Sequence, residues 1–145
     1  MKYLLALACA ATWVGTAQAQ YAFDQPEILA AQRVWGIAHG ARLLAHACSQ
    51  SGKGDAAEAW VAWHERELPQ ILNAGHLLAK HHFGEEAAPP DALASVLGLK
   101  PALALPPEQL EPACATFAEA LAQPRYDLAK RYEELLKELK AEPKP

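Results

Sequence analysis

Residues 55–84 read DAAEAWVAWHERELPQILNAGHLLAKHHFG, and this stretch decides the fold. Its apolar residues recur every three or four positions, which is the spacing of one face of an α-helix. Asp55 and Glu58 form a D-x-x-E capping pattern, and Gly84 stands where a helix commonly ends in a left-handed residue. The pattern predicts one long helix whose buried stripe consists of Ala57, Val61, His64, Leu68, Ile71, Gly75, Leu78 and His82.

A second long helix is predicted directly before this one, over residues 26–49, with Asp24 as its N-cap. The polar turn at 49–54 is short, so the two helices should be antiparallel neighbours. Pro69 removes one backbone donor from the second helix, which predicts a kink near residues 65–68. The buried stripe of the first helix is expected to be Val34, Ile37, Ala41, Leu44 and Cys48.

The rest of the chain predicts shorter helices. We expect a short helix at 91–97 capped by Asp91, an extended connector at 100–107, and helices at 108–121 and 125–141. Pro112 could separate the first turn of the helix at 108–121. Alanine and leucine dominate the composition, which favours helix over sheet. The predicted fold is an all-α bundle of four main helices and one short helix, with a frayed tail at 142–145.

Residues 1–19 have the pattern of an export signal. Lys2 precedes a mostly apolar run that is too short to span a bilayer, and Ala17-Gln18-Ala19 is an A-x-A cleavage site. A lipoprotein site at Cys9 is the alternative, but the apolar run before Cys9 is too short for it. We therefore expect a single domain, residues 20–145, that is periplasmic or secreted and has no membrane span.

Two cysteines, Cys48 and Cys114, remain after the expected cleavage. A pair in an exported chain is most simply a disulfide, and this one would join the first helix to the fourth. A metal-binding or redox pair is the alternative, but the chain contains no C-x-x-C motif.

All six histidines lie between positions 39 and 82, which suggests a transition metal such as Zn or Cu. The candidate ligands are His39, His64 and His46, with Glu65 and Glu67 as supporting carboxylates. His76 with His81 or His82 forms a looser candidate. The alternative is that these histidines are structural, because no H-x-x-x-H pair and no complete H-E-x-x-H motif is present.

Three tryptophans should come close where the two long helices cross. Trp35, Trp60 and Trp63, together with Arg42, form a candidate face for a ligand or a protein partner. Packing of the three indoles in the core is the alternative interpretation.

Motifs for enzymatic activity are missing, since the sequence has no G-x-S-x-G, P-loop, G-x-G-x-x-G or C-x-x-C-H. The net charge of −4 makes nucleic acid a poor partner. We predict a non-enzymatic binding or interaction protein that uses the Trp/His-rich face. The alternatives are a protein that binds or buffers Zn or Cu, and a pH-responsive periplasmic chaperone.

Overall fold

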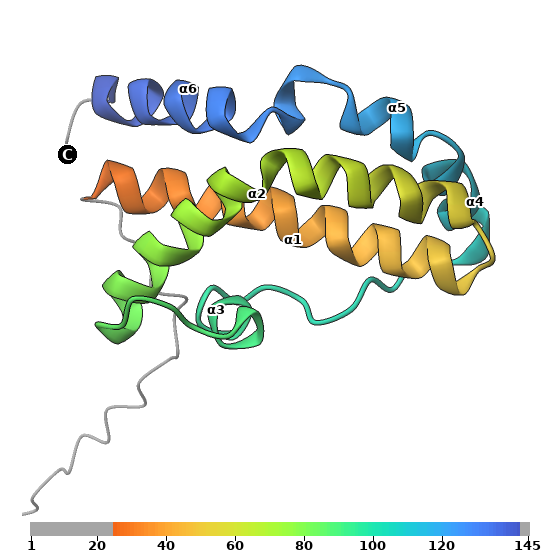
Figure 1. Ribbon diagram of the computed structural model, residues 1–145, viewed down its shortest axis with the longest axis horizontal. Coiled ribbons are helices and arrows are strands. Elements are labelled where there is room, and N and C mark those ends of the chain that lie inside the picture. Colours follow the sequence, from red (N-terminus) through yellow and green to blue (C-terminus); the bar gives the residue numbers. More distant parts are fainter. Residues whose placement is uncertain (1–24, 143–145) are drawn as a thin grey trace, which may run out of the picture.

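A computed structural model describes residues 25–142, and within this range every regular element is a helix (Figure 1). The all-α class is therefore confirmed. The predicted signal at 1–19 and the end of the tail lie outside the described residues. No helix in the described range is long and apolar enough to cross a membrane. The elements are α1 (Pro26–Gln50), α2 (Gly54–Phe83), α3 (Pro90–Val96), α4 (Pro107–Ala115), α5 (Phe117–Leu121), the 3₁₀ turn η1 (Pro124–Tyr126) and α6 (Leu128–Ala141).

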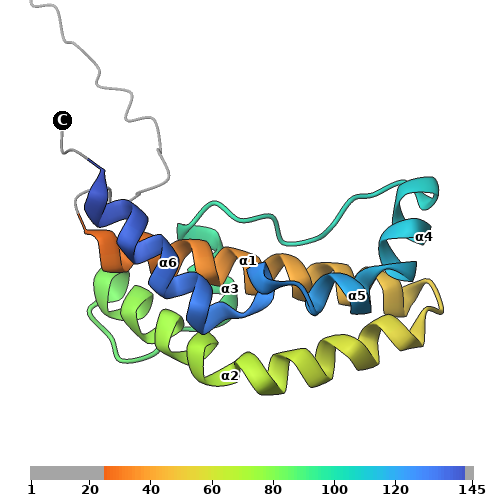
Figure 2. The ribbon, with the colours of Figure 1, turned by 90° about the horizontal axis from the view of Figure 1, so that it is seen from above.

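The antiparallel pair α1 and α2 forms the centre of the molecule, as predicted. A tight turn joins the two helices: Gly52 has φ +74°, and the N–H of Lys53 donates to the carbonyl of Cys48 at 2.9 Å. In Figures 1 and 2, α2 changes direction near its middle. This bend lies in the part of α2 that contains Pro69, whose ring removes a helical hydrogen bond. The second half of α2 consequently diverges from α1.

The α1–α2 pair is covered on two sides. Figure 1 shows α6 along one side and α3 on the opposite side, and Figure 2 agrees with this arrangement. Each neighbouring helix contributes fully buried side chains to a single core. The largest fully buried side chains of this core, including those from α2, are Trp63, Phe117, Leu78, Leu93, Leu128 and Leu135.

The Cys48–Cys114 disulfide is present and joins α1 to α4, as predicted. The two Cα atoms lie 5.6 Å apart, and both residues are buried. Because the bridge closes a separation of 66 residues, it restricts the unfolded chain strongly. The chain-entropy model puts the stabilisation at about 4 kcal/mol.

The predicted N-terminal caps are mostly wrong. The N-caps of α1, α2 and α3 are Gln25, Lys53 and Pro89, and none of them makes a side-chain capping bond. Asp55 and Asp91 lie inside the first turns, where a carboxylate still favours the helix dipole; Asp24 lies outside the described residues. In α1 and α3 a proline lies at the start of the helix. Because proline has no backbone N–H, the first turn has one fewer N–H group without a helical acceptor. The expected end of α2 at Gly84 is confirmed, with φ +71°.

The boundaries of the later helices also differ from the prediction. The stretch 108–121 breaks at Thr116, not after a first turn at Pro112. The Thr116 hydroxyl donates to the Pro112 carbonyl at 3.0 Å, and such back-bonding bends helices. The last helix begins at Leu128 instead of residue 125, because the Asp127 side chain accepts the N–H of Lys130 at 3.1 Å and caps it.

In the first half of α2 the buried stripe is the row of side chains next to the predicted one. Val61 is 48% exposed and His64 is half-buried, whereas Trp63 and Glu67 are buried. The reason is that α2 packs against α1 on one side and against α5 and α6 on another. Periodicity alone could not show which of two adjacent rows is covered.

Trp63 and Glu67 of α2 form hydrogen bonds to the backbone at the start of α6 and directly before it. The Trp63 indole N–H donates to the Tyr126 carbonyl at 2.9 Å, and the two rings meet edge to face. One Glu67 oxygen accepts the N–H of Leu128 at 3.0 Å, and the other accepts from Arg66 at 2.9 Å. A buried carboxylate thus accepts a backbone N–H at the first turn of α6, where the helix dipole favours a negative charge.

We predict that Glu67→Ala lowers the free energy of unfolding by about 1–3 kcal/mol, because it leaves the buried N–H of Leu128 without an acceptor. Urea denaturation measures this change. Glu65→Ala is the matched control, since Glu65 is exposed on the same helix. Equal losses in the two variants would contradict the assigned role of Glu67.

Candidate functional site

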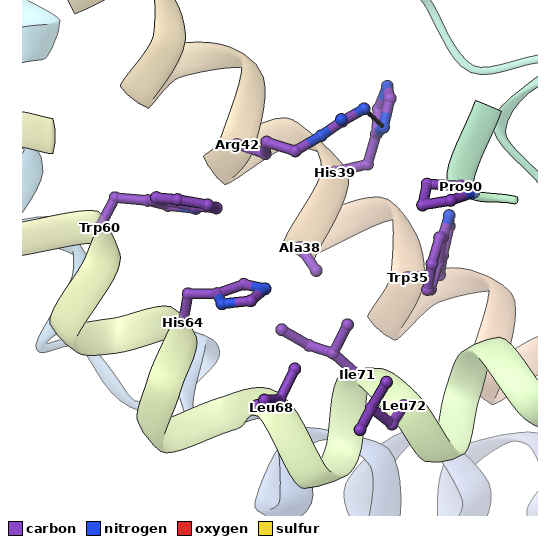
Figure 3. Close-up of a pocket in the computed structure, with 10 residues that line it drawn as sticks. All are labelled: Trp35, Ala38, His39, Arg42, Trp60, His64, Leu68, Ile71, Leu72 and Pro90. Atoms are coloured by element: carbon purple, nitrogen blue, oxygen red, sulfur yellow. Dashed lines mark hydrogen bonds between the residues drawn. The ribbon is translucent and has the colours of Figure 1, made fainter. Parts of the chain in front are cut away.

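A cleft of about 210 Å³ lies between α1 and the bent part of α2 (Figure 3). Its walls come from α1, α2 and the first residue of α3, and the side chains surround an open centre. The lining is mostly apolar, and its polar groups belong to two histidines, one arginine and the indole N–H groups of two tryptophans. The lining residues are Trp35, Ala38, His39, Arg42, Trp60, His64, Leu68, Ile71, Leu72 and Pro90.

The α1 wall follows from helical spacing. Trp35, Ala38, His39 and Arg42 are separated by three, one and three residues, so they occupy one face of α1. The adjoining face of α1, which includes Val34 and Ala41, is buried in the core. The same helix therefore supplies both a core face and a wall of the cleft.

The α2 wall is formed by the row of side chains next to the buried row that contains Trp63 and Glu67. Trp60, His64 and Leu68 are four residues apart, and Ile71 continues the row beyond the bend. The Trp60 and His64 rings lie 4.8 Å apart between centroids with an interplanar angle of 32°. Leu72, at the edge of the cleft, is 62% exposed. Apolar surface of this kind at a cleft mouth is typical of a binding site.

Gly75 allows the Trp35 ring to lie directly against α2. A Cβ atom at position 75 would stand 3.0 Å from Cζ3 of Trp35, so any larger residue would displace the indole. The indole N–H groups of Trp35 and Trp60 are covered, and neither has an acceptor within residues 25–142. Buried donors without partners cost stability, and this is common at functional sites.

His39 is a structural anchor in this wall. It is 8% exposed, and its Nε2–H donates to the Lys100 carbonyl at 2.7 Å, which holds the connector after α3 against α1. Its Nδ1 faces Nη2 of Arg42 at 3.4 Å (dashed in Figure 3). Because a guanidinium can only donate, Nδ1 must be the acceptor, and the neighbours define the Nε2–H tautomer.

The predicted metal set of His39, His64 and His46 is not assembled. His39 and His64 line the same cleft, but His46, about two helical turns after His39, lines an adjoining hollow. Within residues 25–142 no three His, Cys, Asp or Glu side chains are grouped to hold a metal ion. Of the two supporting carboxylates, Glu65 is exposed and Glu67 is bonded to Leu128.

The looser histidine set at the end of α2 is also divided. His76 Nδ1 lies 2.9 Å from the Glu86 carbonyl and 3.3 Å from Oε2 of the Glu86 carboxylate, whose other oxygen, Oε1, accepts from Lys80 at 3.0 Å. The rings of His81 and His82 meet edge to face at 4.7 Å. Burial, and after it the charge of His81, lowers the pKa of His82 below its ordinary value of 6.5.

The residues of the predicted partner face are divided between the cleft and the core. Trp35, Arg42 and Trp60 line the cleft, whereas Trp63 is 1% exposed and belongs to the core. The three-residue step from Trp60 to Trp63 rotates the side chain by about 60°, which is enough to move it from the cleft row to the core row. For Trp63 the core interpretation is therefore the correct one.

A second hollow of about 520 Å³ adjoins the cleft and shares Arg42 and Trp60 with it. The two hollows form one surface feature along α1 and α2, with Arg42 at their junction. The other residues of the second hollow are Leu43, Ala45, His46, Ser49, Ala57, Val61, Asp91 and Pro101.

The contributions of α3 and of the connector after it could not be recognised from the sequence. Pro90 and the Lys100 carbonyl are brought to α1 only by tertiary packing, and no local pattern marks them. The Trp60, His64, Leu68 spacing could have indicated the α2 wall, because it is a strict four-residue row.

Comparisons with protein-family models, with curated proteins and with solved structures found no match.

We predict that replacement by phenylalanine destabilises the protein much more at position 63 than at position 60. Trp63→Phe should lower the free energy of unfolding by about 2–4 kcal/mol, because it leaves a cavity and an unpaired Tyr126 carbonyl. Trp60→Phe should lower the free energy of unfolding by less than about 1 kcal/mol, because the Trp60 ring is only half-buried and the substitution also removes an indole N–H that has no acceptor within residues 25–142. Urea denaturation of both variants checks this, and equal costs would contradict the division between core and cleft.

We also predict a pH effect from His82. Its folded pKa lies below its unfolded value, so below pH 6.5 the unfolded chain binds a proton that the folded chain does not. Stability should therefore fall as the pH drops below 6.5, and His82→Gln should make that slope shallower. His46→Gln, at an exposed position of α1, is the control in thermal melts across this pH range. An unchanged slope in His82→Gln would contradict the prediction.

Proposed function

We propose that the chain is an exported, non-enzymatic binding protein that holds a small molecule in the cleft between α1 and α2. The observation that carries the proposal is the lining itself: two indole rings and several aliphatic side chains surround an open volume of about 210 Å³. Small-molecule sites are typically concave and apolar with a few polar groups that orient the ligand. The cleft is smaller than the about 300 Å³ at which sites for drug-sized ligands begin, so the proposed ligand is small.

The lining also supports a role in binding rather than catalysis. His39 uses both ring nitrogens in bonds to Lys100 and Arg42, which leaves His64 as the imidazole that can meet a ligand. Neither a carboxylate nor a cysteine or serine lines the cleft within the described part of the chain. An acid–base pair or an activated nucleophile would need such a partner.

Export is part of the proposal and rests on the sequence pattern at 1–19. The Cys48–Cys114 disulfide is compatible with it, because disulfides persist in oxidising compartments such as the periplasm.

Nuclear magnetic resonance of ¹⁵N-labelled protein, spanning residues 20–145, tests the binding role. A library of small neutral, anionic and cationic fragments is added, and the indole N–H resonances are followed. We expect ligands to shift the signals of Trp35 and Trp60, which line the cleft, while the signal of Trp63 stays in place as an internal control.

A matched variant connects the shifts to the cleft. Ala38→Phe should fill the space between the two tryptophans and abolish the ligand-induced shifts. The far-UV circular dichroism of this variant must match the parent. A library in which no fragment shifts Trp35 or Trp60, or in which Trp63 shifts equally, would contradict the proposed function.

A further inference from the structure

The polar groups that the cleft offers to a ligand are mainly hydrogen-bond donors. Arg42 can only donate, and its contact with His39 uses one of its five N–H groups. No Asp or Glu from residues 25–142 lines the cleft, although the whole chain has a net charge of −4. A complementary ligand must therefore supply acceptors, and a charged acceptor forms the strongest bonds with a guanidinium.

Arg42 is available for such a ligand. It is exposed and forms no ion pair with any group in the described range, even though the surface is rich in acidic side chains. Its guanidinium is nevertheless oriented, because Nδ1 of the buried His39 accepts from it and His39 is itself bonded to Lys100. An oriented cation loses less conformational entropy when it binds than a free side chain would.

The adjoining hollow indicates on which side of Arg42 an anion would bind. Asp91 lines that hollow together with Arg42 but does not form an ion pair with it. A carboxylate in the second hollow would meet a like charge, whereas one in the first cleft would not. In Figure 3, Trp60 and Trp35 stand on opposite sides of the first cleft, with Arg42 and His39 along its rim.

We infer that the ligand is a small amphiphilic anion, with a flat aromatic body between Trp35 and Trp60 and one carboxylate on Arg42. Offset or edge-to-face contacts between aromatic rings favour such a body over an aliphatic chain. The inference rests on the proposed binding function and adds the charge of the ligand and the residue that selects it. His39 acts as a positioning residue for Arg42.

The test compares two molecules of nearly equal size and shape, of which only one carries a negative charge. The affinity of 3-phenylpropanoate and of its uncharged amide is measured from the shifts of the Trp35 and Trp60 indole signals. We expect the carboxylate to bind about tenfold more tightly, which corresponds to one charge-assisted hydrogen bond. The preference should shrink as salt is added, because the Arg42 side chain is exposed. Acetate, which lacks the aromatic body, should bind far more weakly than either.

The variants Arg42→Gln and Arg33→Gln complete the design. Arg42→Gln should abolish the preference for the carboxylate over the amide. Arg33 lies nine residues earlier on α1, about half a turn round the helix, and is exposed away from the cleft. Arg33→Gln removes the same charge and should keep the full preference, which excludes a general effect of net charge.

The outcomes separate this inference from the function on which it rests. Equal binding of the carboxylate and the amide would overturn the anion inference while leaving the cleft as a binding site. The same holds if only neutral or cationic fragments shift Trp35 and Trp60. A preference that survives in Arg42→Gln would overturn the assignment of Arg42. The absence of any shift with every fragment would overturn the binding function itself.

Discussion

The packing of a bent α2 against α1 is the constraint on which the remaining structure depends. Pro69 lies in the bent part of α2, where its missing N–H weakens the helical ladder. The first half of α2 runs along α1, and the second half leaves it. The bend opens the cleft, and the Cys48–Cys114 disulfide secures the far end of α1 to α4.

Two adjacent rows of α2 have different roles because they face different neighbours. The row with Trp63 and Glu67 forms hydrogen bonds to the backbone of Tyr126 and Leu128, which position the start of α6. The row with Trp60 and His64 faces the cleft, where the indole N–H groups of Trp35 and Trp60 have no acceptor among residues 25–142. The paired donor therefore belongs to the core, and the unpaired donors belong to the proposed binding surface.

The predicted caps of α1 and α3 failed for the same reason. An Asp near a predicted start is only a preference, and prolines at the starts of α1 and α3 set the boundary instead. Asp127 does cap α6, but its own helix was predicted to begin earlier, so its role was overlooked. The predicted metal set of His39, His46 and His64 is not grouped within residues 25–142. His39 instead donates to the Lys100 carbonyl, 61 residues away in the sequence.

Sequence by itself determined the helical class, the antiparallel pair, the disulfide and the left-handed end of α2 at Gly84. Each of these follows from local periodicity, residue chemistry or the count of cysteines. Only the tertiary structure decided which tryptophan is buried, which backbone N–H donates to Glu67 and which backbone carbonyl accepts from His39. Periodicity specifies how side chains are arranged around a helix, but the neighbour that covers each row comes from distant parts of the chain.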